Sequence, residues 1–306
     1  MTGTTAGVAK LVYSSWGLKM AAFLARSTPP GIGYFFGRSV ARWVCSLRNS
    51  EFVAAVRQNQ AVIAAEGGSS ASLDQAVQGV FRNSADSVYE LYHYMSDPAA
   101  LERLYCIDPS FQAVVDRLEF NRRGLLIAGL HMAGFDLGLR WLCRYKFKPL
   151  VLTMPNPQQG RQLELEGRRQ MQMNAVPYSM NALRLAVRHL QEGGMVLSGI
   201  DHPVPPSHSM PNFFGQPALL PTEHIYLAVR ARVPVVVVAS RLEADGRYHI
   251  HASPLVEMDR YPSRAEELCR NAEKVLALAE GFIRKAPQQW LIFQPVWSST
   301  AGAAST

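Results

Sequence analysis

The sequence predicts an α/β protein with a mixed, largely parallel sheet flanked by helices, preceded by a helical N-terminal region. Two observations support this prediction. Up to residue 120 the apolar residues recur at helical spacing, whereas from residue 124 short apolar runs alternate with amphipathic stretches. Strands that alternate with helices are typical of a sheet that is at least partly parallel. With 48% hydrophobic and 18% charged residues, the 306-residue chain can also bury a sizeable core.

The predicted elements follow from these patterns. Strands are expected over 125–130, 149–153, 195–200, 234–239 and 248–252, the last after a hairpin turn at Asp245-Gly246. Helices are expected in the first half over 52–65, 73–95, 97–105 and 111–118. In the second half they are expected over 136–145, 158–173, 181–191, 223–232 (capped by Thr222) and 263–285 (opened by a Ser263/Glu266 capping box).

These elements divide the chain into three parts. Residues 1–48 form an amphipathic segment, and residues 298–306 a small, polar, flexible tail. The domain between them, 49–297, has a helical part over 49–120 and an α/β core over 121–297. The four cysteines lie far apart without C-x-x-C spacing, so neither a disulfide framework nor a zinc ribbon is expected.

Nearly all of the net charge of +7 lies in the N-terminal segment. Residues 1–60 hold seven basic residues and one acidic residue, which leaves 24 basic and 23 acidic residues in the rest of the chain. Two amphipathic helices separated by Pro29-Pro30 are predicted here, and Arg38 and Arg42 lie beside the second apolar stripe. The stripes are Val12, Trp16, Met20, Phe23 and Leu24, and then Phe36, Val40, Trp43, Val44 and Leu47.

Aromatic and aliphatic residues beside basic ones suit helices that lie on an anionic membrane surface. No run approaches the roughly 20 apolar residues that a membrane span requires. We therefore expect a peripheral protein on the cytoplasmic face of the plasma membrane. The alternative is that the stripes pack on the protein's own core.

The strongest chemical signal is His131-Met-Ala-Gly-Phe-Asp136, directly after the predicted strand 125–130. Ligands of open α/β sheets bind beyond the carboxyl ends of the strands. Asp136 would lie in the first turn of the next helix, where the helix dipole favours its charged form. It could then accept a hydrogen bond from one imidazole nitrogen and leave the other as a base for an attacking hydroxyl.

Several other chemistries lack their motifs in this sequence. It has no G-x-S-x-G elbow, no G-x-G-x-x-G and no Walker loop. Direct transfer to a bound acceptor is therefore favoured over a serine acyl-enzyme. Neither a nucleotide cofactor nor a nucleic-acid partner is expected.

Five sequence blocks occur in an order that points to a family. They are HMAGFD at 131–136, EGRRQM around Arg168 and Arg169, LQEGGMVLSGID ending at Asp201, NFFGQPALLPTEHIYLAVRARVPVVVV, and PQQW at 287–290. In these blocks the chain resembles the bacterial lipid A / phosphatidylinositol mannoside acyltransferase family, within the lysophospholipid acyltransferase superfamily. The resemblance runs from about residue 17 to 297.

That resemblance implies an enzyme that moves a fatty acyl group from an acyl thioester, acyl-CoA or acyl carrier protein, to a hydroxyl of a membrane lipid or glycolipid. It implies no cofactor and no metal. His131 and Asp136 would be the catalytic dyad of the HX4D motif. Arg168, Arg169 and Asp201 would shape the acceptor or phosphate end, and Phe213, Phe214 and Gly215 a wall near the acyl chain. His202 and Glu223 would be further substrate-binding positions.

Two alternatives stay open at this point. One is a metal-dependent hydrolase that uses the histidine-rich stretch 201–224, although no H-E-x-x-H or similar ligand spacing supports it. Its ligands would be Asp201, His202, His208 and His224 with His131. The other is a non-catalytic, membrane-peripheral lipid-binding protein.

Overall fold

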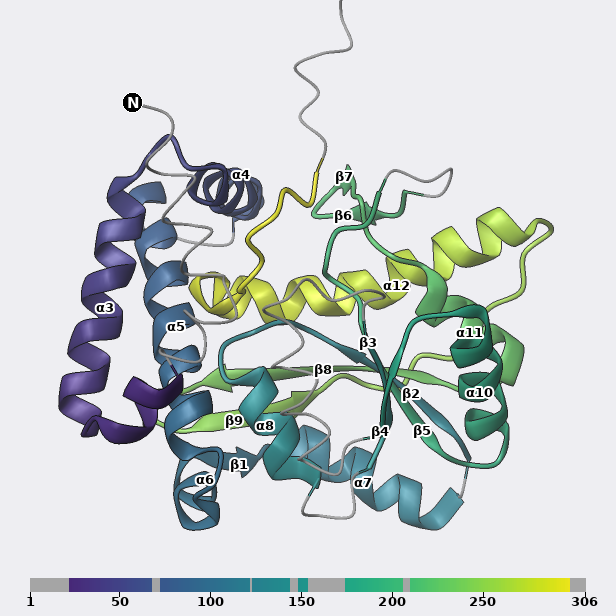
Figure 1. Ribbon diagram of the computed structural model, residues 1–306. Coiled ribbons are helices and arrows are strands. Elements are labelled where there is room, and N and C mark those ends of the chain that lie inside the picture. Colours follow the sequence, from purple (N-terminus) through teal and green to yellow (C-terminus); the bar gives the residue numbers. More distant parts are fainter. Residues whose placement is uncertain are drawn as a thin grey trace, which may run out of the picture.

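A central sheet organises the protein (Figure 1). The structure is a computed structural model, and it describes residues 22–67, 72–121, 123–143, 148–153, 174–205 and 210–297. Within these residues, seven strands lie in the order β1-β9-β8-β2-β5-β3-β4, and of their pairings only β8–β9 is antiparallel. The strands are β1 Tyr105–Ile107, β2 Leu125–Gly129, β3 Leu150–Thr153, β4 Asn174–Pro177, β5 Met195–Gly199, β8 Val235–Leu242 and β9 Tyr248–Ala252. The predicted fold class is therefore confirmed.

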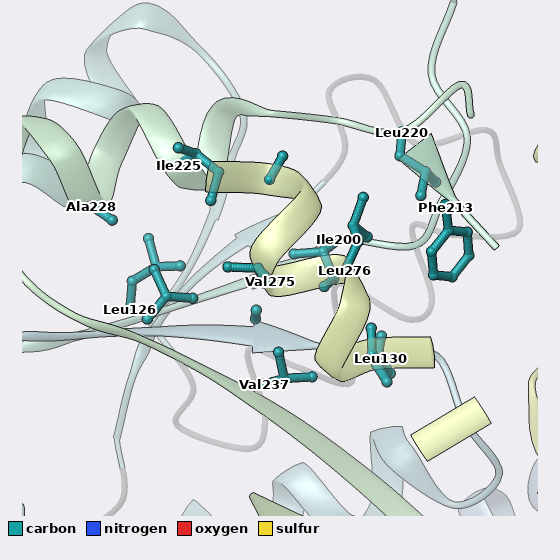
Figure 2. Packing of buried hydrophobic residues seen from close by; sticks show 14 of the residues in the cluster. Leu126, Leu130, Ile200, Phe213, Leu220, Ile225, Ala228, Val237, Val275 and Leu276 are labelled. Atoms are coloured by element: carbon teal, nitrogen blue, oxygen red, sulfur yellow. The ribbon is translucent and has the colours of Figure 1, made fainter. Parts of the chain in front are cut away.

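Helices cover both faces of this sheet. On one face lie α10 Met180–Gln191, α11 Glu223–Ala231 and α12 Arg264–Lys285; on the other lie α6 Pro98–Leu104, α7 Pro109–Asn121 and α8 Phe135–Leu142. Successive residues of β2 point to opposite faces, so Leu126 packs in the first core and Ile127 in the second. Figure 2 shows the first core, where Leu126 and Val237 of the sheet face Val275 of α12. Burial on both faces explains why β2 is a continuous apolar run.

The N-terminal region is helical, as predicted. It consists of the helical residues 22–27 and of α3 Pro30–Ser46, α4 Glu51–Ala65 and α5 Leu73–Tyr94. Helix α3 packs along α5 through small residues: a Cβ on Gly33 would lie only 2.0 Å from the Tyr89 ring. Arg38 of α3 forms a two-pronged ion pair with the buried Asp86 of α5, with N···O distances of 2.9 Å.

The second predicted amphipathic stripe divides in two. Phe36, Val40 and Trp43 are at least about half exposed, and Phe35 beside them is 63% exposed. Val44 instead packs on the buried cluster between α3, α4 and α5. Most of the first stripe lies outside the described residues. None of the helices in the described ranges combines the length and apolar character that a bilayer crossing requires.

Several details differ from the sequence-based expectations. Strands β1 and β4, and the small hairpin of β6 Asn212–Phe213 and β7 Gln216–Pro217, had no pattern long enough to predict them. The side chain of Thr222 does not cap α11, whereas the Ser263 hydroxyl accepts the backbone N–H of Glu266 at 3.2 Å. The predicted helix 158–173 lies outside the described residues.

Candidate active site

The His131–Asp136 turn lies at the carboxyl edge of the sheet, as predicted. His131 follows β2, and α8 begins at Phe135. Gly134 precedes that helix with φ 73°, a left-handed conformation that favours glycine. A Cβ there would also lie 2.9 Å from the Tyr105 hydroxyl, which donates to the Gly134 carbonyl at 2.7 Å. Asp136 is exposed in the first turn of α8.

Asp201 lies beside His131 because their strands are neighbours. β2 and β5 are parallel and in register, with Gly129 opposite Gly199, so both chains leave the sheet at the same place. The His131 Nδ1 is 2.6 Å from Asp201 Oδ1, and the His131 backbone N–H donates to Oδ2 at 2.8 Å. The carboxylate thus holds both the ring and the backbone of His131.

Asp201 is fully buried and yet ionised. Burial by itself would raise the pKa of its carboxyl, but the electrostatic interaction with His131 and the hydrogen bonds from His131 and Trp290 outweigh burial. The pKa of Asp201 therefore lies below its ordinary value. The indole N–H of Trp290 donates to Oδ2 at 2.9 Å, so the carboxylate has three donors around it.

An ionised carboxylate at Nδ1 fixes the tautomer of His131. Nδ1 carries the proton and donates it to Asp201, which leaves the lone pair on Nε2. The side chain of His131 is 37% exposed, so a substrate can reach it. The ring lies tightly over β5, where a Cβ on Gly199 would come within 2.7 Å of His131 Cε1.

The C-terminal segment closes the turn from the other side. The Leu291 N–H donates to the His131 carbonyl, and the Ala133 N–H donates to the Gln289 carbonyl, both at 2.8 Å. The PQQW block therefore positions the His131–Asp136 turn as well as Asp201. The sequence did not predict this role of Trp290. It showed only a tryptophan in the PQQW block, without indicating which residue it contacts.

The structure places the other predicted site residues at different depths. The His202 ring lies 5.8 Å from that of His131, between centroids. Phe213 and Phe214 are fully buried, and Phe213 packs 6.0 Å from Trp290, so both belong to the core behind the site. Gly215 continues the β6–β7 turn with φ 70°, and Glu223 is exposed in the first turn of α11. Arg168 and Arg169 lie outside the described residues.

The residues of the alternative metal site are only partly described, because His208 lies outside the described ranges. Within those ranges, no group of three or more His, Cys, Asp or Glu side chains could hold a metal ion. His224 is 1% exposed, and in the described part of the chain neither ring nitrogen has a hydrogen-bond partner. Burial lowers the pKa of His224 to about 3, so its ring is neutral.

This buried histidine makes stability depend on pH. Between pH 6.5 and about 3 the unfolded chain binds a proton at His224 and the folded chain does not. The free energy of unfolding therefore falls as the pH falls through this window, by at most ~1.4 kcal/mol per pH unit. We expect wild type to lose roughly 2–3 kcal/mol more than His224→Leu between pH 6.5 and 4.5. Denaturant titrations of both proteins measure this difference, and parallel pH profiles would contradict it.

Comparison with known protein families shows the family to which the chain belongs. The family model of the bacterial lipid A biosynthesis acyltransferases matches residues 9–299, which include every block described above. A search of curated proteins found no match. The matched span covers nearly the whole chain, with β2, β5 and the C-terminal PQQW block inside it. The chain therefore belongs to the bacterial lipid A biosynthesis acyltransferase family, whose members transfer acyl groups to lipid.

Proposed function

We propose that this protein transfers a fatty acyl group from an acyl thioester to a hydroxyl of a membrane lipid or glycolipid, with His131 as the general base. The observation that carries the proposal is the contact of His131 Nδ1 with the buried, ionised Asp201 at 2.6 Å. An imidazole held in this way keeps its Nε2 lone pair ready for a proton.

The reaction follows from this geometry. Nε2 of His131 takes the proton of the acceptor hydroxyl as its oxygen attacks the thioester carbonyl carbon. The imidazolium that forms is stabilised by Asp201. When the tetrahedral intermediate collapses, the C–S bond breaks and the thiolate leaves with the proton from His131. The products are an ester and a free thiol, so no acyl-enzyme and no metal are required.

We propose a supporting role for Asp136. It was predicted as the partner of His131, but Asp201 occupies the Nδ1 side of the ring. Asp136 is exposed two residues after Gly134, at the same edge of the sheet. A carboxylate there, at the entrance to the turn, suits the orientation of the acceptor or of the incoming thioester.

The proposed acyl donor is acyl-CoA or acyl carrier protein. One assay tests the proposed function and shows which of the two thioesters the protein uses. The full chain is incubated with each thioester and a bacterial lipid extract, and products are identified by mass spectrometry. We expect a lipid heavier by one acyl group and an equal amount of free thiol. Release of free fatty acid without an ester product would favour a hydrolase, and no turnover of either thioester would favour a lipid-binding protein.

The exposed apolar face of α3 is the proposed contact with the membrane, on its cytoplasmic side. This face consists of Ile32, Phe35, Phe36, Val40 and Trp43. Its basic neighbours contribute less than the sequence suggested, because Arg38 pairs with Asp86, and Arg48 and Arg57 with Asp74. We therefore expect apolar burial to supply most of the binding energy, and anionic lipid to add a smaller, salt-sensitive part.

Substitution of Trp43 or Phe36 by serine is expected to weaken vesicle binding about tenfold each, because burying such a side chain is worth ~1.5–3 kcal/mol. Co-sedimentation with vesicles of neutral and anionic lipid measures this. Leu185→Ser is the matched control, since Leu185 is 45% exposed but lies on α10. Equal loss in all three variants, or in none, would contradict the assignment of the α3 face.

A further inference from the structure

A second feature lies far from His131. A hollow of about 790 Å³ opens between α10, α11 and α12. Its walls are strongly basic: they include Arg230 and Arg232 at the end of α11, Arg260 before α12, and Arg264 at the start of α12. Tyr226 and Glu267 also line the hollow.

The acidic groups around this hollow are already paired. Glu267 forms an ion pair with Arg260 at 3.3 Å, Glu257 with Arg123 at 2.9 Å, and Asp259 with Lys274. Across the described ranges, no carboxylate forms an ion pair with the other three arginines of the wall. Those are Arg230, Arg232 and Arg264. The hollow therefore keeps an excess of positive charge that no carboxylate of the described residues neutralises.

Arg264 is the most informative of the three. Arg230 and Arg232 lie at the C-terminal end of a helix, where the dipole stabilises cations. Arg264 lies instead at the N-terminal end of the 22-residue α12, directly after the N-cap Ser263. The helix dipole disfavours a cation at that end. The Arg264 guanidinium is kept there over the Tyr226 ring, 4.9 Å from the centroid. An anion in the hollow would be stabilised by both the guanidinium and the helix end.

The hollow is at the opposite edge of the sheet from the catalytic turn. α10 leads directly into the start of β5, and α11 into the start of β8, whereas His131 follows the end of the parallel β2. Figure 1 also shows α10 and α11 at the end of the molecule away from α3. A ligand here neither reaches His131 nor meets the membrane that α3 would contact, so it comes from solution.

We propose that this hollow binds a soluble, phosphate-bearing polyanion of about the size of a nucleoside diphosphate. Guanidinium groups bind phosphate oxygens through paired hydrogen bonds. Three arginines that form no ion pair with a described carboxylate line this hollow, and its volume lies within the usual range of small-molecule sites. The site is separate from the acyl-transfer site, and its test does not depend on the proposed function.

Calorimetric titration of the full chain with pyrophosphate and with ADP, at constant ionic strength, tests the proposal. We expect one site per chain for both, weakened at least tenfold in Arg264→Gln and in Arg230→Gln. Arg184→Gln is the matched control, because Arg184 is an exposed arginine of α10 outside the hollow; it should bind within twofold of wild type. No binding of either anion, or an equal loss in Arg184→Gln, would overturn the proposal.

Two further arms identify the source of the anion. In co-sedimentation with anionic vesicles, Arg264→Gln should bind like wild type; a tenfold loss would assign the hollow to lipid head groups instead. Binding of an acidic carrier protein that Arg264→Gln abolishes, without binding of pyrophosphate or ADP, would assign it to a protein. Both results would contradict a soluble phosphate ligand. Acyl transfer by Arg264→Gln in phosphate-free buffer should match wild type, which separates this site from the catalytic turn.

Discussion

His131→Ala is expected to lower the rate of acyl transfer by 10²–10⁴-fold, the usual contribution of a general base. The substitution removes the Nε2 lone pair that accepts the proton of the attacking hydroxyl. It should change the rate constant of the transfer step more than substrate binding, because proton transfer takes place in the transition state. Single-turnover rates with a saturating thioester measure this directly.

A control variant separates the loss of the base from the loss of a histidine. His249→Ala removes an imidazole of strand β9 that pairs with Asp245 in the turn before that strand. It should keep wild-type turnover. His131→Ala should fold, because the His131 side chain is partly exposed at a strand end and only its neighbours are fully buried. Thermal unfolding of all samples checks this. Near-wild-type turnover by folded His131→Ala would show that His131 is structural.

Asp201→Asn is expected to lower the rate of acyl transfer almost as much as His131→Ala does. The reason lies in the contacts of the Asp201 carboxylate. Two N–H groups, the His131 backbone and the Trp290 indole, point at Oδ2, so the amide oxygen must take that position. The amide NH₂ then faces His131 Nδ1 and forces it to be an acceptor. The ring proton moves to Nε2, where a base is needed. The same change in the serine-protease triad costs about 10⁴-fold.

Asp136→Asn supplies the comparison. Asp136 is exposed, and its proposed role is to orient a substrate. The fall in the acyl-transfer rate should therefore be at least tenfold smaller in Asp136→Asn than in Asp201→Asn. Asp136→Glu should be tolerated in part. Rates of the three variants under identical conditions order the two carboxylates. If Asp136→Asn were the more damaging change, Asp136 would be the partner of His131 that the sequence suggested.

The sequence predicted the fold well where patterns are long. The apolar runs of β2, β5 and β8 are distinct because both faces of these strands are buried. β1 and β4 have three and four residues, and their pairing depends on neighbours distant in the chain. Such short strands have no periodicity of their own.

The site was predicted in part for a similar reason. The position of His131 at a strand end could be derived from one local motif. Its contact with Asp201, 70 residues away, depends on β2 and β5 being neighbours, which alternation alone does not specify. The role of Trp290 depends in addition on α12 bringing the C-terminal segment back over the turn. Long-range contacts of this kind are set by strand order and not by local pattern.

A double-mutant cycle tests the central claim, that His131 and Asp201 act as one catalytic unit. Acyl-transfer rates are measured for wild type, His131→Ala, Asp201→Asn and the double variant, all checked for folding. Residues that act through one step are strongly non-additive, so the double variant should be no more than about threefold slower than His131→Ala. If the two losses instead multiply, Asp201 acts independently of His131, and the account of the site is wrong.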